Sequence, residues 1–343
     1  MMKSTKAKQN HGKNKKNNPN HNFVKSQVGD INKRFYDNFL ESYFFIKVSN
    51  LYSLLNSSDD ERKKIYDLRI DKLEISGEYK PSENAVEKYV ITEIVMTMFQ
   101  CMETYLRMYM AHSALTGCPN LILADLTIKD YQKNVKNIAM GKFNTMNTKY
   151  TDDELITITF YASEENIQQL ASKWNKTVEY VIEQNKKYLQ YAASFVLDNS
   201  EYNSFKHGMY VSQENSGFSW GDENKGLSKQ GDALVYIGKT RHSDGQLQWT
   251  KIVKWVDIKL YATLILVFNL YLDTLLQFWE DILVKKSEQI KLLLPHDLDE
   301  IKKNHGESGV RLRNRNSEED LQGLQESLFI TSLKFPYSYY REE

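Results

Sequence analysis

The stretch ENAVEKYVITEIVMTMFQCMETYLRMYMAHSAL, residues 83–115, decides the fold class. Its apolar side chains recur every three or four positions, which places them on one face of a helix. That core stripe comprises Val86, Val90, Ile94, Met98, Met102, Tyr105 and Tyr109. Ser82 is expected to cap the start of the helix, and Gly117 with Pro119 is expected to end it. We therefore predict a long core helix within a mainly α-helical bundle.

Helical patterns continue on both sides of this stretch. We expect helices over residues 35–55, 59–70, 125–140, 177–207 and 257–293. In the first of them the apolar spacing selects Phe39, Tyr43, Ile46, Leu51 and Leu54. Residues 151–161 fit either a strand or a helix. Residues 213–250 are rich in Gly, Ser, Asn and Asp, which predicts a loop with a small β-hairpin inserted between two bundle helices.

This pattern divides the chain into four parts. Residues 1–34 form a basic tail expected to be disordered, because nine Lys or Arg and few apolar residues cannot offset the entropy of ordering. Residues 35–80 form a helical N-terminal cap. Residues 81–294 form the bundle, with the insertion at 209–256. Residues 295–343 form a polar, mobile C-terminal tail. The basic tail either contacts nucleic-acid phosphates or is simply solvated.

Composition excludes several classes of protein. The 343 residues contain 45 basic and 45 acidic side chains, so no overall field favours nucleic acid or a membrane. Two cysteines are too few for a secreted disulfide scaffold, and Cys101 is expected in the core. The apolar run at 261–272 is shorter than the ~20 residues that a membrane span needs, so we expect a buried helix. Without a signal-peptide pattern, the cytoplasm is the expected location.

Standard catalytic signatures are missing from the sequence. It contains no glycine-rich phosphate loop, no G-x-S-x-G, no H-E-x-x-H and no C-x-x-C. The seven histidines do not pair at metal-ligand spacing on one helix. The sequence therefore predicts neither a metal nor a cofactor.

A polar helix end, YNSFKHG at residues 202–208, remains as a candidate site. Asn203 and His207 are four positions apart and share a helical face, and Lys206 adjoins the histidine. A histidine at a helix C-terminus titrates in a range that suits proton transfer, and a lysine there stabilises a charged phosphodiester. The same residues also suit an ordinary helix cap followed by Gly208, with no further role.

A second candidate pair interrupts the apolar half of the long helix. Glu103 and Arg107 lie four positions apart, so they can pair on one face. Such a pair is either a structural ion pair of small energetic value or, surrounded by apolar residues, part of a site.

The YNSFKHG segment resembles the helix-end motif of HEPN-like proteins, which are helical bundles of toxin–antitoxin, CRISPR-associated and phage-defence systems. The order of elements over about residues 85–290 is similar as well. Active ribonucleases of that family commonly carry R-N-x-x-x-H. Asn203 and His207 match this motif, whereas Tyr202 stands at the Arg position and residues 108–240 contain no Arg.

The resemblance implies a metal-independent ribonuclease that works as a homodimer on RNA. Either Lys206 or Arg107 would supply the missing positive charge, or the site is an inactive RNA-binding version. A different hypothesis is a non-catalytic helical scaffold in which the motif only caps its helix. A third, weaker hypothesis is a membrane-surface protein that uses the basic tail.

Overall fold

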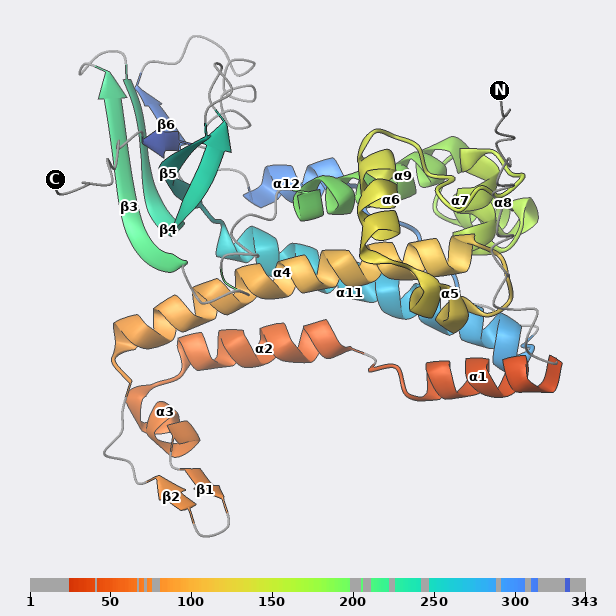
Figure 1. Ribbon diagram of the computed structural model, residues 1–343, viewed down its shortest axis with the longest axis horizontal. Coiled ribbons are helices and arrows are strands. Elements are labelled where there is room, and N and C mark those ends of the chain that lie inside the picture. Colours follow the sequence, from red (N-terminus) through yellow and green to blue (C-terminus); the bar gives the residue numbers. More distant parts are fainter. Residues whose placement is uncertain are drawn as a thin grey trace, which may run out of the picture.

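The computed structural model describes residues 25–40, 42–66, 68–70, 73–75, 81–197, 205, 211–221, 226–241, 247–287, 291–305, 310–313 and 331–333. These residues form a mainly α-helical protein with a small antiparallel sheet (Figure 1). Both features agree with the fold class that the sequence predicts.

The helices stack in three layers (Figure 1). Their bounds are α1 (Lys25–Asp37), α2 (Tyr43–Asn56), α3 (Asp59–Tyr66), α4 (Glu83–Ser113), α5 (Pro119–Asp125), α6 (Ile128–Ala139), α7 (Asp152–Tyr161), α8 (Glu164–Lys173), α9 (Val178–Leu197), α11 (Ile258–Glu280) and α12 (Leu298–His305). The central layer is α4 packed against α11, with α1 and α2 on one side and α6, α9 and α12 on the other.

The central helix α4 follows the sequence prediction closely. Ser82 caps it, since the Ser82 side chain accepts a hydrogen bond from the backbone N–H of Ala85 at 3.2 Å. Every residue of the predicted core stripe is buried, and so is Cys101. Gly117, just beyond the helix, has φ +75°, a left-handed conformation that favours glycine.

Aromatic rings join α4, α9 and α11. The ring of Phe268 on α11 lies edge-on to Tyr105 at 5.1 Å and to Tyr188 at 5.2 Å between centroids. Asp257 caps α11 by accepting from the N–H of Leu260 at 2.9 Å. These edge-to-face contacts fix three helices around one ring, which makes this the centre of the core.

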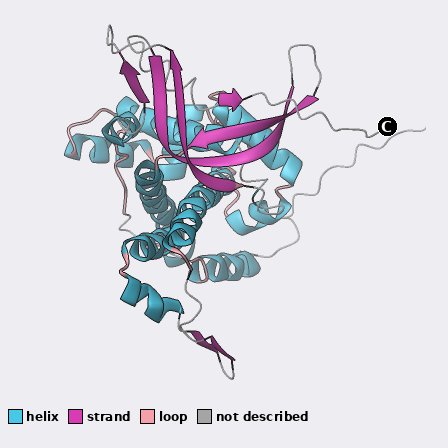
Figure 2. Ribbon diagram, turned by 90° about the vertical axis from the view of Figure 1, so that its left-hand side faces the viewer, coloured by secondary structure: helices cyan, strands magenta, loops and turns pink. Residues whose placement is uncertain are grey.

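The sheet lies at one end of the bundle, on the side away from the hairpin of β1 (Leu68–Ile70) and β2 (Leu73–Ile75) (Figure 2). Its main strands are β3 (Ser212–Gly221), β4 (Gly226–Arg241) and β5 (Leu247–Trp255). Two short strands, β6 (Val310–Arg313) on β4 and β7 (Thr331–Leu333) on β5, complete an antiparallel sheet. The insertion is thus larger than the single hairpin expected from its composition. Leu234 on β4 is buried in the main helical core.

The N-terminal expectations need correction. Residues 25–34 belong to α1 and are not part of a disordered tail, while residues 1–24 lie outside the described residues. Contacts with distant residues explain the order, since Asn32 donates to the Gly117 carbonyl at 2.8 Å. The expected helix over 59–70 ends at Tyr66, and β1 (Leu68–Ile70) pairs with β2 (Leu73–Ile75).

The C-terminal expectations also need correction. The helix that begins after Asp257 does not reach Leu293, because α11 ends at Glu280 and a π-helical turn, Asp281–Lys285, follows it. Lys286 has φ 52°, which stops the helix. The tail from 295 is not wholly mobile, since α12, β6 and β7 belong to it. Leu298 is 2% exposed within the main core, and this burial anchors α12.

Helix α2 buries the predicted Leu51, but its first two turns face the core with different residues from those predicted. Phe44, Val48 and Leu51 are buried, whereas Tyr43 and Ile46 are 43% and 54% exposed. The ambiguous segment 151–161 is helix α7, capped by Thr151 through a capping box with Glu154.

One described helix is long and apolar enough to cross a membrane. It is α11 with its π-helical turn, Ile258–Lys285, and half of its most apolar window is buried inside the structure. A core helix meets the same criterion, and the contacts of Phe268 with Tyr105 and Tyr188 place α11 in the core.

Candidate functional site

The predicted charged pair on α4 forms as expected. The Arg107 guanidinium donates to Glu103 Oε1 through Nε at 3.1 Å and Nη2 at 2.9 Å. Both side chains are about 30% exposed, although most neighbouring residues on this part of α4 are buried. A pair at this exposure contributes less than ~1 kcal/mol to stability, because solvent screens it.

Helix α6 positions the guanidinium of this pair. Thr127 caps α6 by accepting from the N–H of Asp130 at 3.1 Å, and the buried face of the helix carries Tyr131. The Arg107 guanidinium carbon lies 4.2 Å from the centroid of the Tyr131 ring, a cation–π contact. The ring and the carboxylate together hold the guanidinium in one place, with part of its surface open to water.

The other predicted site residues, Asn203, Lys206 and His207, lie outside the described residues. Helix α9, which precedes them in the sequence, ends at Leu197. Its last turns approach the middle of α4, since the rings of Phe195 and Phe99 are 4.5 Å apart. Phe99 precedes Arg107 by eight residues, about 12 Å along the helix axis. The meeting of His207 with Arg107 therefore remains a prediction.

A second polar group on α4 is fully buried. His112 Nδ1 is 2.7 Å from the Met108 carbonyl and Nε2 is 3.0 Å from the Tyr36 hydroxyl. The carbonyl can only accept, so Nδ1 carries the proton, and Nε2 accepts from Tyr36. Burial lowers the pKa of His112 to about 4, with the Met108 hydrogen bond opposing the shift. This neutral imidazole ties α1 to α4, which is a structural role.

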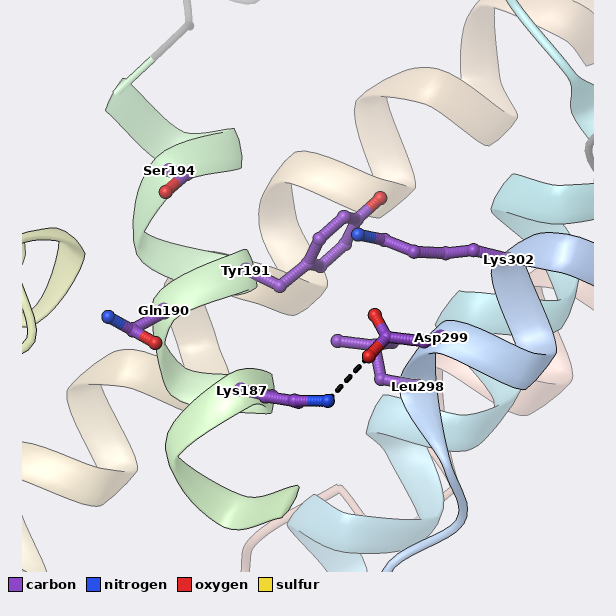
Figure 3. Close-up of a pocket in the computed structure, with 7 residues that line it drawn as sticks. All are labelled: Lys187, Gln190, Tyr191, Ser194, Leu298, Asp299 and Lys302. Carbon is purple, nitrogen blue, oxygen red and sulfur yellow. Dashed lines mark hydrogen bonds and ion pairs between the residues drawn. The ribbon is translucent and has the colours of Figure 1, made fainter. Parts of the chain in front are cut away.

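An open hollow of about 290 Å³ lies between α9 and α12 (Figure 3). Lys187 and Tyr191 of α9 face Leu298, Asp299 and Lys302 of α12 across it. No sequence pattern predicts this hollow on the α12 side, because residues 295–343 are expected to be mobile. On α9 a signal was present, since Lys187, Tyr191 and Ser194 recur at helical spacing along one face.

Metal ligation has no candidate among the described residues. No group of three or more His, Cys, Asp or Glu side chains in the described part of the chain could hold a metal ion.

Comparison with known proteins does not assign the chain. No family model matches it, and no curated protein or solved structure matches it either. The class that the fold defines is a mainly α-helical bundle with a sheet insertion, and any function has to be argued from the residues.

Proposed function

We propose that this protein binds RNA and cleaves it as a HEPN-like ribonuclease. The observation that carries the proposal is the Glu103–Arg107 pair, which keeps a partly exposed guanidinium on the mainly apolar second half of a core helix. Planar guanidinium groups bind phosphate oxygens well, because their N–H donors match the geometry of the anion. The family resemblance of the YNSFKHG segment supplies the reaction class.

The chemistry follows from the residue types. Cleavage of RNA by its own 2′-hydroxyl forms a new P–O bond and breaks the bond to the 5′-oxygen. His207 would take the proton from the 2′-hydroxyl or return one to the leaving oxygen. Arg107 and Lys206 would stabilise the charge on the phosphorus oxygens, and Asn203 would orient the imidazole. No step in this scheme requires a metal.

The composition of the sheet supports an RNA partner. Its strands contain more basic than acidic positions, in contrast to the neutral chain as a whole. The basic positions, without the buried Lys254, are Lys229, Lys239, Arg241, Lys251, Arg311 and Arg313, against the acidic positions Glu214 and Asp232. Local positive charge of this kind favours contact with a phosphate backbone.

The assembly and setting belong to the same proposal. The family resemblance implies two motifs that meet across a shared groove, with Arg107 of one copy beside His207 of a second. We therefore propose a homodimer. A cytoplasmic bacterial defence or toxin system is the setting that the family resemblance suggests.

A non-catalytic scaffold is the second candidate, and one observation favours it. Glu103 and the Tyr131 ring already hold the Arg107 guanidinium, so this charge is stabilised without any ligand. In this version the residues only cross-link helices of the bundle.

Purified protein incubated with mixed RNAs, with a chelator or with divalent metal, separates the two candidates. We expect cleavage in the chelator, loss of cleavage in His207→Ala, and an unchanged helical circular dichroism signal. A folded His207→Ala protein with full activity would reject His207 as a catalytic residue. If the unmodified protein neither binds nor cleaves RNA, the scaffold function is the correct one.

A further inference from the structure

The hollow between α9 and α12 brings two lysines together from different helices. Lys187 of α9 is ion-paired with Asp299 of α12, and Lys302 lies one turn further along α12 (Figure 3). Tyr191 and Leu298 form the apolar part of the lining. A partly apolar hollow with a few converging polar groups is the usual form of a ligand site.

Lys302 supplies the uncompensated charge of this hollow. Its Nζ lies 4.8 Å from the centroid of the Tyr191 ring, and among the described residues it forms no ion pair. The hydrogen bond from Lys187 to Asp299 raises the pKa of Lys187, so that this amine stays protonated. Among the residues that line the hollow, the ammonium groups of Lys187 and Lys302 and the carboxylate of Asp299 leave one net positive charge.

Nearby carboxylates set a limit on the affinity for an anion. Asp297 and Glu183 both act on Lys187 through space. The Asp297 carboxylate is largely occupied, since it accepts from the N–H groups of Asp299 at 2.9 Å and Glu300 at 3.1 Å as the cap of α12. A cap of this kind compensates the carboxylate charge with the positive helix end.

We propose that this hollow binds a phosphate group of single-stranded RNA, with Lys302 and Lys187 as the contacts and Asp299 as a charge that weakens binding. The RNA identity of the ligand rests on the proposed function, whereas the phosphate chemistry rests on the lysines. Helix α9 carries the hollow, and the segment with His207 follows this helix in the sequence.

The test measures the anisotropy of a short fluorescein-labelled single-stranded RNA with full-length protein carrying His207→Ala, so that the RNA stays intact. Lys302→Gln and Lys187→Gln should each weaken binding about fivefold and reduce the salt slope by ~0.7. Asp299→Asn should strengthen binding by a similar factor. Lys303→Gln and Glu300→Gln are matched controls, because these exposed neighbours on α12 do not line the hollow.

The outcomes separate the hollow from the proposed function. RNA binding that changes equally in the lining variants and in their matched controls overturns the hollow as a site and leaves the RNA function standing. If RNA does not bind, titrations with inorganic phosphate and AMP test whether the hollow binds phosphate groups at all. Binding of either probe that depends on Lys302 supports a phosphate site for a free ligand, and no binding of either overturns the proposal.

Discussion

Helix α4 carries two polar groups whose environments differ sharply. His112 is 1% exposed, neutral and hydrogen-bonded on both ring nitrogens, whereas Glu103 and Arg107 are charged and about 30% exposed. Burial gives His112 a structural role, whereas partial exposure leaves the Glu103–Arg107 pair open to a ligand. An imidazole with a pKa of about 4 is a poor proton shuttle at neutral pH, while an exposed guanidinium can still meet a phosphate.

The largest expected effect on stability comes from replacing the buried His112. His112→Ala leaves the Met108 carbonyl and the Tyr36 hydroxyl without their partner and opens a cavity. We expect a loss of about 4 kcal/mol in the free energy of unfolding. Urea denaturation followed by circular dichroism measures it. If His112→Ala lost less unfolding free energy than Arg107→Ala, the structural role of His112 would be contradicted.

The pH dependence of stability tests the same imidazole. Its folded pKa of about 4 lies below the unfolded value of 6.5, so the unfolded chain takes up the proton first as pH falls. The stability due to the neutral imidazole is complete above pH 6.5 and decreases between pH 6.5 and 4, by roughly 3 kcal/mol. Asparagine has no proton to take up in this range. In His112→Asn the free energy of unfolding, measured by urea denaturation at several pH values, should therefore lack the part of the decrease that His112 causes. If the unmodified protein and His112→Asn lost stability identically between pH 6.5 and 4, His112 would not be a buried neutral group.

A smaller effect is expected when only the hydroxyl partner is removed. Tyr36→Phe keeps the ring against α4 but leaves His112 Nε2 without a donor, for a loss of about 1.5 kcal/mol. The exchange of backbone amide hydrogens in α1 should quicken, since Tyr36 is one of its anchors to α4. Tyr43→Phe is a control because this tyrosine is 43% exposed and should leave stability unchanged.

The smallest effect on stability is expected for the exposed pair. Glu103→Ala and Arg107→Ala should behave alike, each costing less than ~1 kcal/mol, because solvent screens the charge left behind. RNA binding should nevertheless weaken in Arg107→Ala, as measured by anisotropy. If one variant is harmless and the other unfolds the protein, the pairing account is wrong.

How far the sequence predicts the fold depends on how well its pattern separates two faces of a helix. Helix α4 is buried over most of its surface, including apolar residues outside the stripe such as Ile91 and Phe99, so every predicted core residue is buried whichever face is chosen. In α2 nearly every early position is apolar, YFFIKV, and the spacing selected Tyr43 and Ile46 in place of Phe44 and Val48. Helix α12 is short and polar, and burial of Leu298 against distant residues decides its position.

The sequence predicts the contacts of the candidate site only where both residues lie close together in the chain. Glu103 and Arg107 lie on one helix at a spacing of four, so their contact follows from helix geometry. The Tyr131 ring beside Arg107 and the hollow between α9 and α12 join segments far apart in the chain. No local pattern contains such pairings, because they depend on how the helices pack.

The central claim is that His207 shares a groove with the Glu103–Arg107 pair, within one copy or across two. Cross-linking with a short thiol-specific reagent between cysteines at positions 103 and 207 tests this most directly. Cysteines at 187 and 299 serve as the positive control, because these residues form an ion pair. We predict a cross-link within one chain or a covalent dimer for the 103–207 variant. A cross-link at 187–299 with none of either kind at 103–207 would contradict the account.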